Sequence, residues 1–465
     1  MVNDSTKLTR LSPLDGSEVG TFSLTAPKEV PAVVAVARAA FSSWSTTTIE
    51  SRGRIIRQAA QLIESRADEL ATVVRAETGK PLGASLGEVS GAVEMGYLMA
   101  SHGRHPQGST LPSAIPGRHV RVQRMPRGVA ALIVTYNAPL PNYAWKVFPA
   151  LMAGNVAILK PSPATPKSAE MFVEILHSAG VPRDALQLVH GYGETAAALI
   201  EQGVDLVSFT GSYPTGQKVT EASAKHLAKT VIELGGANPL IVCDDADIDR
   251  AVATVVDSAF SNAGQRCSSG SRVIIQDSLY EKFRDALLGA SAKVTWGIEP
   301  DVDVSTLIDR DSVDAFEAYV AKAEGAGALV HRVGRPVGTP SGEACLAQPA
   351  LIENLEISSD EGMAEFFGPA TRLFSFTTDD EAVRMANTSD YGLTAAVWSS
   401  NIVRAEHIVS RLAAGVININ GPTHGAEVNM PFGGVKHSGN GSRDAGVFAI
   451  DQYSDVQVVS TFFGV

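Results

Sequence analysis

Residues 155–190, NVAILKPSPATPKSAEMFVEILHSAGVPRDALQLVH, contain two short apolar runs separated by an amphipathic stretch. Short apolar runs bounded by turn residues are typical of buried strands, and the stretch between them has the length of a helix. The same alternation extends from 129 to 243, with apolar runs at VAALIV, NVAILK, LQLVH, LVSFT, TVIEL and PLIVC. Near-continuous apolar strands between amphipathic helices predict a parallel, doubly wound α/β sheet with both faces covered.

Different patterns flank this region. Residues 28–103 are rich in Ala, Glu, Arg and Leu at helical spacing, which predicts a helical layer. Residues 105–128 place Pro and Gly around the alternating run HVRVQRM, which is typical of an exposed strand outside the main domain. A second α/β pattern follows from about 244 to 430, and the tail DVQVVSTFF alternates again.

Composition and charge disfavour several classes of protein. The net charge of −12 argues against nucleic acid or an anionic membrane as the main partner, because both attract basic surfaces. No apolar run approaches the roughly 20 residues that span a bilayer, and the N-terminus lacks the apolar segment of a signal peptide. The three cysteines suit a reducing compartment, and no Cys-x-x-Cys or His-Glu-x-x-His motif occurs. We therefore expect a cytoplasmic protein with no membrane partner and no bound metal.

Two glycine-containing segments lie between a predicted strand and a predicted helix. In LVSFTGSYPTGQKV, Gly211 and Gly216 are placed where free backbone N–H groups and the helix dipole can hold a diphosphate. HGYGETA places Gly191 and Gly193 similarly. A P-loop requires Lys and then Ser or Thr directly after Gly216, whereas Gln and Lys follow, so a nucleoside triphosphate site is not expected. Each segment is also compatible with an ordinary tight turn.

The segment SNAGQRCSSG, residues 261–270, places Cys267 among Ser, Gly, Asn and Gln instead of the apolar neighbours of an inert thiol. Glu233 ends a predicted strand, and Asn137 follows the end of another. Active-site groups gather at the carboxyl ends of strands in open α/β sheets. The three residues could therefore be a nucleophile, a general base and an oxyanion stabiliser. The alternative is a buried thiol, a solvated carboxylate and a helix-capping or turn-forming asparagine.

Six segments, in order along the chain, resemble the signatures of the aldehyde dehydrogenase family. They are PRGVAALIVTYNAPLPNYAWKVFPALMAGNVAILKPS (126–162), FTGSYPTG (209–216), IELGGANP (232–239), NAGQRCSSGSRV (262–273), EFFGP (365–369) and MPFGGVKHSG (430–439). The resemblance covers nearly the whole chain from about residue 10. It implies oxidation of an aldehyde to a carboxylic acid, with NAD or NADP as cofactor.

The resemblance also implies a role for each candidate catalytic residue. Cys267 would attack the aldehyde carbon to form a thiohemiacetal, and the side-chain amide of Asn137 and the backbone N–H of Cys267 would stabilise the oxyanion. Transfer of hydride to the nicotinamide would leave a thioester, and Glu233 would activate the water that hydrolyses it. The small polar neighbours of Cys267 suit a thiolate, whose ionisation an apolar pocket would suppress.

A larger set of residues is assigned to the cofactor by the same resemblance. These residues are Thr135, Lys160, Gly191, Gly211, Ser212, Leu234, Glu365 and Phe367. Lys160 would bind the adenosine ribose, and Gly191 would lie beside the adenine. Gly211 and Ser212 would bind the diphosphate, and Glu365 the nicotinamide ribose, with Phe367 packed nearby. Taken alone, Lys160 is also compatible with a solvated surface lysine.

Several positions depart from the family pattern. Pro163 lies three residues after the lysine, where many NAD-preferring members carry Glu, and this leaves NADP open as a cofactor. Tyr136 replaces the more usual Trp. Asp444 would orient the water near Glu233, although its segment SGNGSRDAG is one residue longer than the pattern.

The substrate class rests on two residues beside the candidate catalytic ones. Ala138 follows Asn137 where many relatives have a bulky aromatic residue, which favours an aromatic or otherwise bulky aldehyde. Arg266, beside Cys267, could instead attract the anionic tail of a semialdehyde. A rival from another class is a cofactor-independent thiol hydrolase, which needs a histidine base, and no histidine lies near Cys267 in the sequence.

The chain is therefore expected to have three parts. Residues 1–107 and 127–235 would form a dinucleotide-binding domain, and residues 236–445 an α/β catalytic domain. Residues 108–126 and 446–465 would form a small β oligomerisation element. The alternating strand at the tail offers an unpaired edge that a neighbouring subunit can cover, so we expect a homodimer or a homotetramer.

Overall fold

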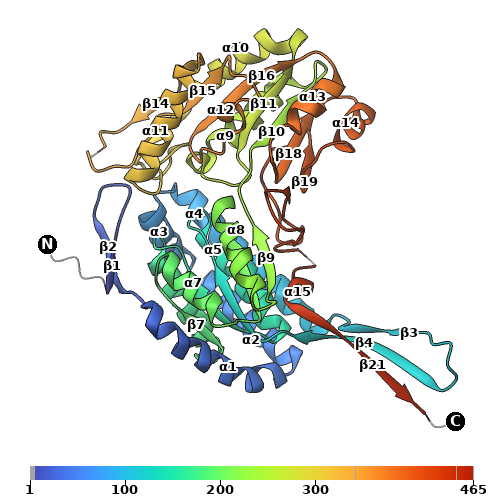
Figure 1. Ribbon diagram of the computed structural model, residues 1–465. Coiled ribbons are helices and arrows are strands. Elements are labelled where there is room, and N and C mark those ends of the chain that lie inside the picture. Colours follow the sequence, from blue (N-terminus) through green and yellow to red (C-terminus); the bar gives the residue numbers. More distant parts are fainter. Residues whose placement is uncertain (1–5, 341, 447, 464–465) are drawn as a thin grey trace.

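The computed structural model describes residues 6–340, 342–446 and 448–463 (Figure 1). Two α/β units lie one above the other in this view, and a narrow β arm projects from the lower one. Among the described residues, no helix is both long enough and apolar enough to cross a bilayer.

The lower unit is built on a five-stranded parallel sheet in the order β7-β6-β5-β8-β9. Its strands are β5 (Val129–Ile133), β6 (Val156–Lys160), β7 (Leu186–Leu188), β8 (Leu206–Thr210) and β9 (Lys229–Glu233). The chain runs outward from β5 to β7 and then returns to place β8 against the other edge of β5. This reversal of strand order confirms the doubly wound sheet, and it opens a crevice at the carboxyl ends of β5 and β8, where such folds bind ligands.

Helices cover both faces of this sheet. On one side α5 and α6 pack against the strands and are backed by α2, α3 and α4, whereas α1, α7 and α8 cover the other side. The predicted helical layer is confirmed as four helices, α1 (Val30–Thr46), α2 (Ile49–Ser65), α3 (Ala67–Thr78) and α4 (Leu82–Ser101). The crossover helices are α5 (Pro139–Ala153), α6 (Pro166–Ser178), α7 (Gly193–Glu201) and α8 (Tyr213–Ala224). A hairpin of β1 (Lys7–Leu11) and β2 (Glu18–Ser23), which the sequence patterns did not predict, precedes them.

The upper unit contains a seven-stranded sheet in the order β13-β15-β16-β11-β10-β18-β19, parallel except for β13 at its edge. Its strands are β10 (Asn238–Val242), β11 (Gly270–Gln276), β13 (Leu329–Arg332), β15 (Ala350–Glu353), β16 (Ala370–Phe376), β18 (Thr394–Trp398) and β19 (Val416–Ile419). The run PLIVC continues the first apolar alternation, but it lies within the expected catalytic domain (236–445) and forms β10 in this second sheet. Buried parallel strands have the same apolar pattern in either sheet, so the pattern did not reveal which sheet β10 joins.

Two apolar clusters pack on opposite faces of the seven-stranded sheet. The helices on one face are α9 (Ile248–Phe260), α10 (Tyr280–Ser291) and α11 (Arg310–Gly325), and those on the other are α13 (Asp379–Ala386) and α14 (Ile402–Val409). Smaller elements complete this unit: η3 (Ser261–Gly264), η4 (Asp277–Leu279), β12 (Thr295–Gly297), β14 (Arg335–Val337), α12 (Asp360–Met363), β17 (Tyr391–Gly392) and β20 (Val435–Lys436).

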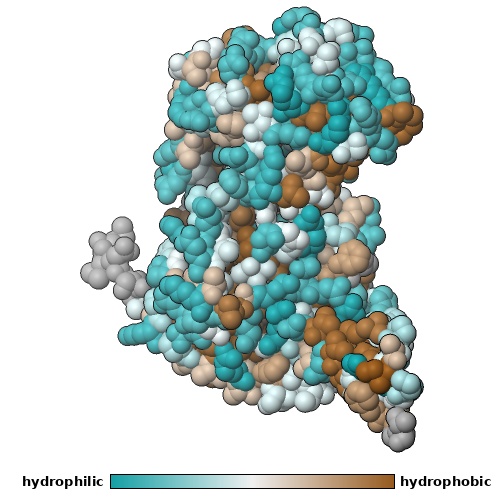
Figure 2. Space-filling view, turned by 45° about the vertical axis from the view of Figure 1, so that its right-hand side comes forward, coloured by the Kyte–Doolittle hydropathy of each residue, from teal (hydrophilic) through white to brown (hydrophobic). Residues whose placement is uncertain are grey.

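The projecting arm joins two segments that are far apart in sequence. It consists of β3 (Gly108–Leu111), β4 (Arg118–Pro126) and β21 (Ser454–Phe462), in the antiparallel order β21-β4-β3. Apolar side chains such as Val456 and Val458 are exposed on β21, and Figure 2 shows hydrophobic surface at the base of the arm. The pairing of β4 with β21 agrees with one β element made of both segments, whose role in oligomerisation stays a prediction.

Short helices connect the arm and the N-terminal hairpin to the lower unit. These are η1 (Pro27–Glu29), η2 (His102–Arg104) and α15 (Ala449–Gln452). Ile450 of α15 and Tyr453 belong to the apolar core of the lower unit, so the chain returns to its first domain before it forms β21.

Candidate active site

A cavity of about 690 Å³ lies where the two α/β units meet. It collects most of the residues singled out from the sequence, from both units. The predicted residues that line it are Asn137, Glu233, Cys267, Thr135, Gly211, Ser212, Leu234, Glu365 and Phe367. Three of these residues lie within two positions of the end of a strand: Thr135 after β5, Gly211 after β8 and Leu234 after β9. The cavity therefore occupies the predicted crevice at the carboxyl edge of the sheet.

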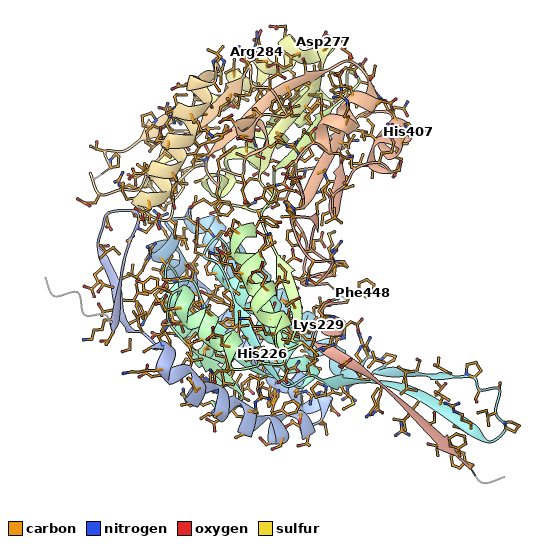
Figure 3. The ribbon with its side chains drawn as sticks, viewed as in Figure 1. His226, Lys229, Asp277, Arg284, His407 and Phe448 are labelled. Carbon is orange, nitrogen blue, oxygen red and sulfur yellow. The ribbon has the colours of Figure 1, made fainter. Side chains whose placement is uncertain are left out.

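His226 and Lys229, labelled in Figure 3, lie at the amino end of β9, at the opposite end of the strand from Glu233. Glu233 and the other candidate catalytic residues therefore lie at the carboxyl edge of the sheet, in the wall of the cavity. Among the described residues, no group of three or more His, Cys, Asp or Glu side chains could hold a metal ion.

Cys267 is presented by an unusual left-handed turn. After α9 ends, Asn262, Ala263 and Gly264 have φ values of 56°, 52° and 68°. Asn tolerates this region and Gly adopts it freely. A Cβ on Gly264 would lie 1.9 Å from the carbonyl oxygen of Gly368, so only glycine fits there. Beyond the turn, the side-chain amide of Asn238 donates to the carbonyl of Cys267 at 2.7 Å, which fixes the backbone at the sulfur.

We expect the substitution Gly264→Ala to lower the thermal midpoint of unfolding by several degrees. The methyl group must displace the Gly368 backbone and hold an alanine in the left-handed region, which costs about 1–2 kcal/mol by itself. Calorimetry would measure the shift, and the rate of alkylation of Cys267 would show whether the turn still presents the thiol. Gly289→Ala, where an added Cβ meets nothing within 4 Å, is the matched control. An unchanged midpoint for Gly264→Ala would contradict the tight approach of Gly368.

The environment of Cys267 differs from the sequence-based expectation. Burial raises the pKa of its thiol to about 12, and the nearby carboxyl groups of Glu233 and Glu365 contribute in the same direction. The backbone N–H groups of Cys267 and Ser268 oppose this rise. The expectation that small polar neighbours favour a thiolate was therefore wrong, because the loop is enclosed between the two units. At neutral pH a neighbouring base would therefore promote ionisation of this thiol.

Glu233 is buried at the end of β9, with 3% of its surface exposed. Neither of its carboxyl oxygens has a hydrogen-bond partner among the described residues. Burial raises its pKa well above the ordinary value, and the negative charge of Asp444 adds to this, whereas Lys146 and Arg443 oppose it. The alternative of a solvated carboxylate is thus wrong, and burial strengthens this carboxylate as a proton acceptor, which suits a general base.

A buried ion pair that the sequence analysis missed lies next to Glu233. Lys146, on α5, is fully buried, and its Nζ lies 2.5 Å from Asp444 Oδ2 and 2.9 Å from Ser208 Oγ. The hydroxyl of Tyr453 in turn donates a hydrogen bond to Ser208 Oγ at 3.0 Å. The pair fixes a negative charge beside Glu233. A single lysine within the apolar run AWKVFPAL was the available signal, because an unpaired charge is not tolerated on a buried helix.

The side chain of Asn137 is oriented by its neighbours. Its Oδ1 accepts a hydrogen bond from Asn142 Nδ2 at 3.4 Å, and its backbone carbonyl accepts from Asn262 Nδ2 at 3.2 Å and from Lys80 Nζ. With Oδ1 occupied, the Nδ2 group of Asn137 has no acceptor among the described residues. A free amide donor therefore lines the same cavity as Cys267.

The residues assigned to the cofactor fit a dinucleotide. Ser212 precedes α8, whose first backbone N–H groups have no side-chain cap, so the helix start can receive a diphosphate. Glu365 accepts the backbone N–H of Gly236 at 3.2 Å, and burial raises its pKa to about 7. A Cβ on Gly235 would lie 2.0 Å from Glu365 Oε2, so glycine is required beside that carboxylate. A Cβ on Gly216 would lie 2.5 Å from Leu234, which gives this glycine a packing role.

Lys160 and Gly191 are the two predicted residues that do not line the cavity. Lys160 ends β6 and is 5% exposed, so it is not the solvated lysine of the alternative interpretation. Its Nζ donates to the carbonyl of Pro161 at 3.1 Å, and burial lowers its pKa to about 8, an effect that Glu194 opposes. A Cβ on Gly191 would lie 2.1 Å from Thr195 Oγ1, so this glycine permits close packing of α7. Both residues remain at the carboxyl edge of the sheet.

Comparison with known proteins decides the family. The model of the aldehyde dehydrogenase family matches residues 1–459. This chain belongs to the aldehyde dehydrogenase family. It is 35% identical to human 2-aminomuconic semialdehyde dehydrogenase over 93% of this chain and 90% of the relative. It is 32% identical to betaine aldehyde dehydrogenase from Bacillus subtilis over 97% of this chain and 93% of the relative.

A solved structure agrees with this assignment. Betaine aldehyde dehydrogenase from Staphylococcus aureus, in complex with NAD+, superimposes with a TM-score of 0.95 at 31% identity, covering 99% of this chain and 92% of that one. The protein is therefore an NAD(P)-dependent aldehyde dehydrogenase, with NAD or NADP as its cofactor. The family indicated by the six sequence segments and the α/β fold predicted from the alternating apolar runs are both confirmed.

Proposed function

We propose that this aldehyde dehydrogenase oxidises a bulky or aromatic aldehyde to the carboxylic acid through a covalent adduct on Cys267. The observation that carries the proposal is the convergence, in one cavity, of a thiol, an unpartnered buried carboxyl group and a free amide donor. These belong to Cys267, Glu233 and Asn137, which come from three separate segments of the chain.

In the first half of the reaction, the sulfur of Cys267 attacks the aldehyde carbon while Glu233 accepts the thiol proton. The oxyanion that forms is stabilised by Nδ2 of Asn137 and the backbone N–H of Cys267. Bound NAD or NADP supplies a two-electron acceptor for the C–H bond of this adduct, and Glu365 and Ser212 are among the residues that would hold it. Oxidation leaves a thioester on Cys267.

In the second half, Glu233 first releases the thiol proton to solvent and then removes a proton from the water that attacks the thioester carbon. The C–S bond breaks, the sulfur of Cys267 takes this proton from Glu233, and the carboxylic acid is released. Burial, and after it the negative charge of Asp444, raise the pKa of Glu233 and so favour its acceptance of these protons. The same buried base therefore serves both halves.

The shape of the cavity supports a bulky substrate. Its wall includes Ala138 and, from α4, Gly87 and Gly91, at which an added Cβ would meet nothing closer than 4 Å. Aromatic side chains also line it, among them Trp145 and Phe432, whose ring centroids lie 5.6 Å apart. Open space beside aromatic walls suits an extended or planar aldehyde.

Two other candidates have specific observations in their favour. An anionic semialdehyde is supported by Arg266, which lines the cavity beside Cys267. A cofactor-independent thiol hydrolase would need a histidine, and His424 does line the cavity, 3.0 Å from Asp257. However, no hydrogen bond joins His424 to the Cys267 sulfur among the described residues. The hydrolase is therefore the weaker candidate.

One assay separates these functions. The protein is mixed with NAD or NADP and a panel of aldehydes that includes benzaldehyde and succinic semialdehyde, and reduced nicotinamide is followed in the near ultraviolet. We expect turnover of benzaldehyde that depends on the cofactor. Efficient ester cleavage without added cofactor, together with no aldehyde oxidation, would contradict the proposal and favour the hydrolase.

We expect Asn137→Ala to lower kcat by about 100- to 1,000-fold, because one preorganised oxyanion donor is lost. Alkylation of Cys267 by iodoacetamide should proceed at the wild-type rate, since that reaction forms no oxyanion. Asn142→Ala is the matched control: it removes only the hydrogen bond to Asn137 Oδ1 and should cost far less. Steady-state kinetics within threefold of wild type for Asn137→Ala would exclude this residue as the donor.

The assembly and location remain part of this proposal. The exposed apolar side chains of β21, including Val456 and Val458, support a homodimer or homotetramer built through the arm. The three cysteines are free, which is consistent with a cytoplasmic protein. Sedimentation analysis of the full chain would give the subunit number.

A further inference from the structure

A fully buried arginine on β16 holds the segment that precedes Glu365. Arg372 has 0% of its surface exposed and forms no ion pair with any described residue. Its Nη1 donates to the backbone carbonyl of Glu361, its Nη2 to that of Ala364 at 3.0 Å, and its Nε to that of Ser271 at 3.0 Å. A buried charge with only neutral partners rarely adds stability over a well-packed apolar side chain. What this guanidinium supplies is therefore the placement of three carbonyl groups.

The same guanidinium also contacts the aromatic ring that follows Glu365 in the chain. The central carbon of the Arg372 guanidinium lies 4.9 Å from the ring centroid of Phe366. The ring of Tyr319, on α11, stacks on Phe366 with centroids 4.5 Å apart and an angle of 20° between the planes. The hydroxyl of Tyr319 donates at 3.0 Å to the carbonyl of Glu361, which also accepts from Arg372. Arg372 and Tyr319 thus hold both the ring of Phe366 and the backbone before it.

The held segment leads into a strained turn in the wall of the cavity. Residues 365–367 line the cavity, and Phe367 has a φ of 49°, in the left-handed region that a bulky side chain rarely adopts. A Cβ on the next residue, Gly368, would lie 2.3 Å from the ring of Phe316 on α11. Such a backbone conformation persists only where the surrounding contacts over-determine it. The contacts of Arg372 and Tyr319 are on one side of this turn, and the close approach to Phe316 is on the other.

The carboxylate of Glu365 has little support of its own. From the described residues it accepts one hydrogen bond, from the backbone N–H of Gly236 at 3.2 Å. Arg272, the neighbour of Arg372 in register on β11 and also fully buried, donates at 2.8 Å to the carbonyl of Ala237, one residue after Gly236. Each side of the contact between Glu365 and Gly236 is therefore anchored by a buried guanidinium. The place of this carboxylate depends on how its backbone is held.

We propose that Arg372 is a positioning residue for the cofactor, because its hold on the carbonyls of Glu361 and Ala364 fixes Glu365 where the nicotinamide ribose binds. This rests on the proposed function, in which Glu365 is among the residues that hold NAD or NADP. Arg372 does not line the cavity, so it acts through the 361–368 segment and touches neither cofactor nor substrate. Only arginine presents donors from three nitrogens in one rigid plane, and lysine can replace part of this set.

The first test measures binding without aldehyde and without turnover. Calorimetric titration gives the Kd of NAD or NADP, whichever binds more tightly, and of its fragment without the nicotinamide ribose, ADP or 2′-phospho-ADP. We expect Arg372→Met to weaken the dinucleotide by about 10- to 100-fold, the effect of one lost hydrogen bond to a carboxylate, and to leave the fragment unchanged. Arg372→Lys should recover part of the loss. Steady-state kinetics should show the same selectivity, with KM raised for the cofactor and not for the aldehyde.

Two further variants separate positioning from stability. Arg52, on α2, is buried as well and donates only to backbone carbonyls, those of Met152, Thr47 and Ser45, in the lower unit. Arg52→Met is therefore the matched control: it should lower the midpoint of thermal unfolding but leave the ratio of the two Kd values as in wild type. Should Arg372→Met not fold, Arg372→Lys and Tyr319→Phe decide, since Tyr319→Phe removes only the hydroxyl that donates to Glu361. It should weaken the dinucleotide selectively, by less than Arg372→Met.

Hydrogen exchange gives a readout that needs no ligand. The backbone amides of residues 361–368 are followed by mass spectrometry in wild type and in Arg372→Lys. We expect exchange in this segment to be at least about fivefold faster in the variant, the effect of roughly one lost hydrogen bond. Exchange in α8, at the start of which the diphosphate would bind, should not change.

The outcomes distinguish this inference from the proposed function. Equal weakening of dinucleotide and fragment in Arg372→Met would make the residue purely structural and overturn the inference, as would an unchanged dinucleotide Kd or unchanged exchange of residues 361–368. None of these results would affect the chemistry at Cys267. A Glu365→Gln variant that binds the dinucleotide as tightly as wild type would instead remove Glu365 from the cofactor site, and with it that part of the proposed function.

Discussion

Replacing Cys267 with alanine is expected to abolish aldehyde oxidation, with kcat/KM reduced at least about 1,000-fold. The cavity wall contains no second thiol, and the hydroxyl of the neighbouring Ser268 is a far weaker nucleophile than sulfur. The fold should persist, because the loop is fixed by the left-handed turn before Cys267 and by the contacts of Asn238 with the backbone behind it. The absorbance of reduced nicotinamide would measure aldehyde oxidation, and a separate binding measurement would show whether the variant still binds the cofactor.

The chain supplies matched controls for this experiment. Cys243 and Cys345 are free as well but, unlike Cys267, which is partly exposed, they are buried; burial raises the pKa of both thiols, and neither lines the cavity. Alanine at either position should leave kcat/KM near the wild-type value. Single-turnover mass spectrometry of wild type should locate the acyl group on Cys267. An acyl adduct on another residue, or an active Cys267→Ala variant, would contradict the mechanism.

The sequence predicted the site through polarity at strand ends. Glu233 and Asn137 interrupt an otherwise apolar pattern just where a parallel strand stops, and such ends converge at one edge of a doubly wound sheet. The polar surroundings of Cys267 in SNAGQRCSSG similarly distinguished it from the other two cysteines. Ordered motifs over the whole chain then fixed the family, because their joint match is far more specific than any one glycine turn.

Burial and long-range pairing were the parts that sequence did not predict. The thiol environment of Cys267 depends on how closely two units enclose a polar loop, and local composition carries no information about that enclosure. Lys146 pairs with Asp444, and His424 lines the same cavity as Cys267, although the members of each pair are far apart in the chain. The apolar pattern alone likewise did not show which sheet β10 joins, since strand order depends on crossovers that this pattern does not encode.

Glu233→Gln should lower kcat by about 100- to 10,000-fold, because both the thiol and the attacking water lose their base. At alkaline pH the Cys267 thiol ionises without help, so the first half of the reaction should partly recover while hydrolysis does not. A burst of reduced nicotinamide close to one per active site should then appear, followed by accumulation of the thioester. Stopped-flow absorbance would record the burst, and mass spectrometry the adduct. Glu88→Gln, which changes a partly buried carboxyl group of the same cavity that is paired with Lys80, is the control and should give no burst.

The pH profile of wild type provides an independent test of the same base. Burial and the charge of Asp444 raise the pKa of Glu233, so its ionised, proton-accepting form is present only above that raised pKa. Activity should therefore rise with pH in a limb that lies above the ordinary carboxyl range. Asp444→Asn removes the neighbouring negative charge and leaves Lys146 unpaired, and both changes lower the pKa of Glu233. The limb should move to lower pH in this variant and vanish in Glu233→Gln, whereas a limb unchanged in both variants would assign the titration to another group and refute Glu233 as the base.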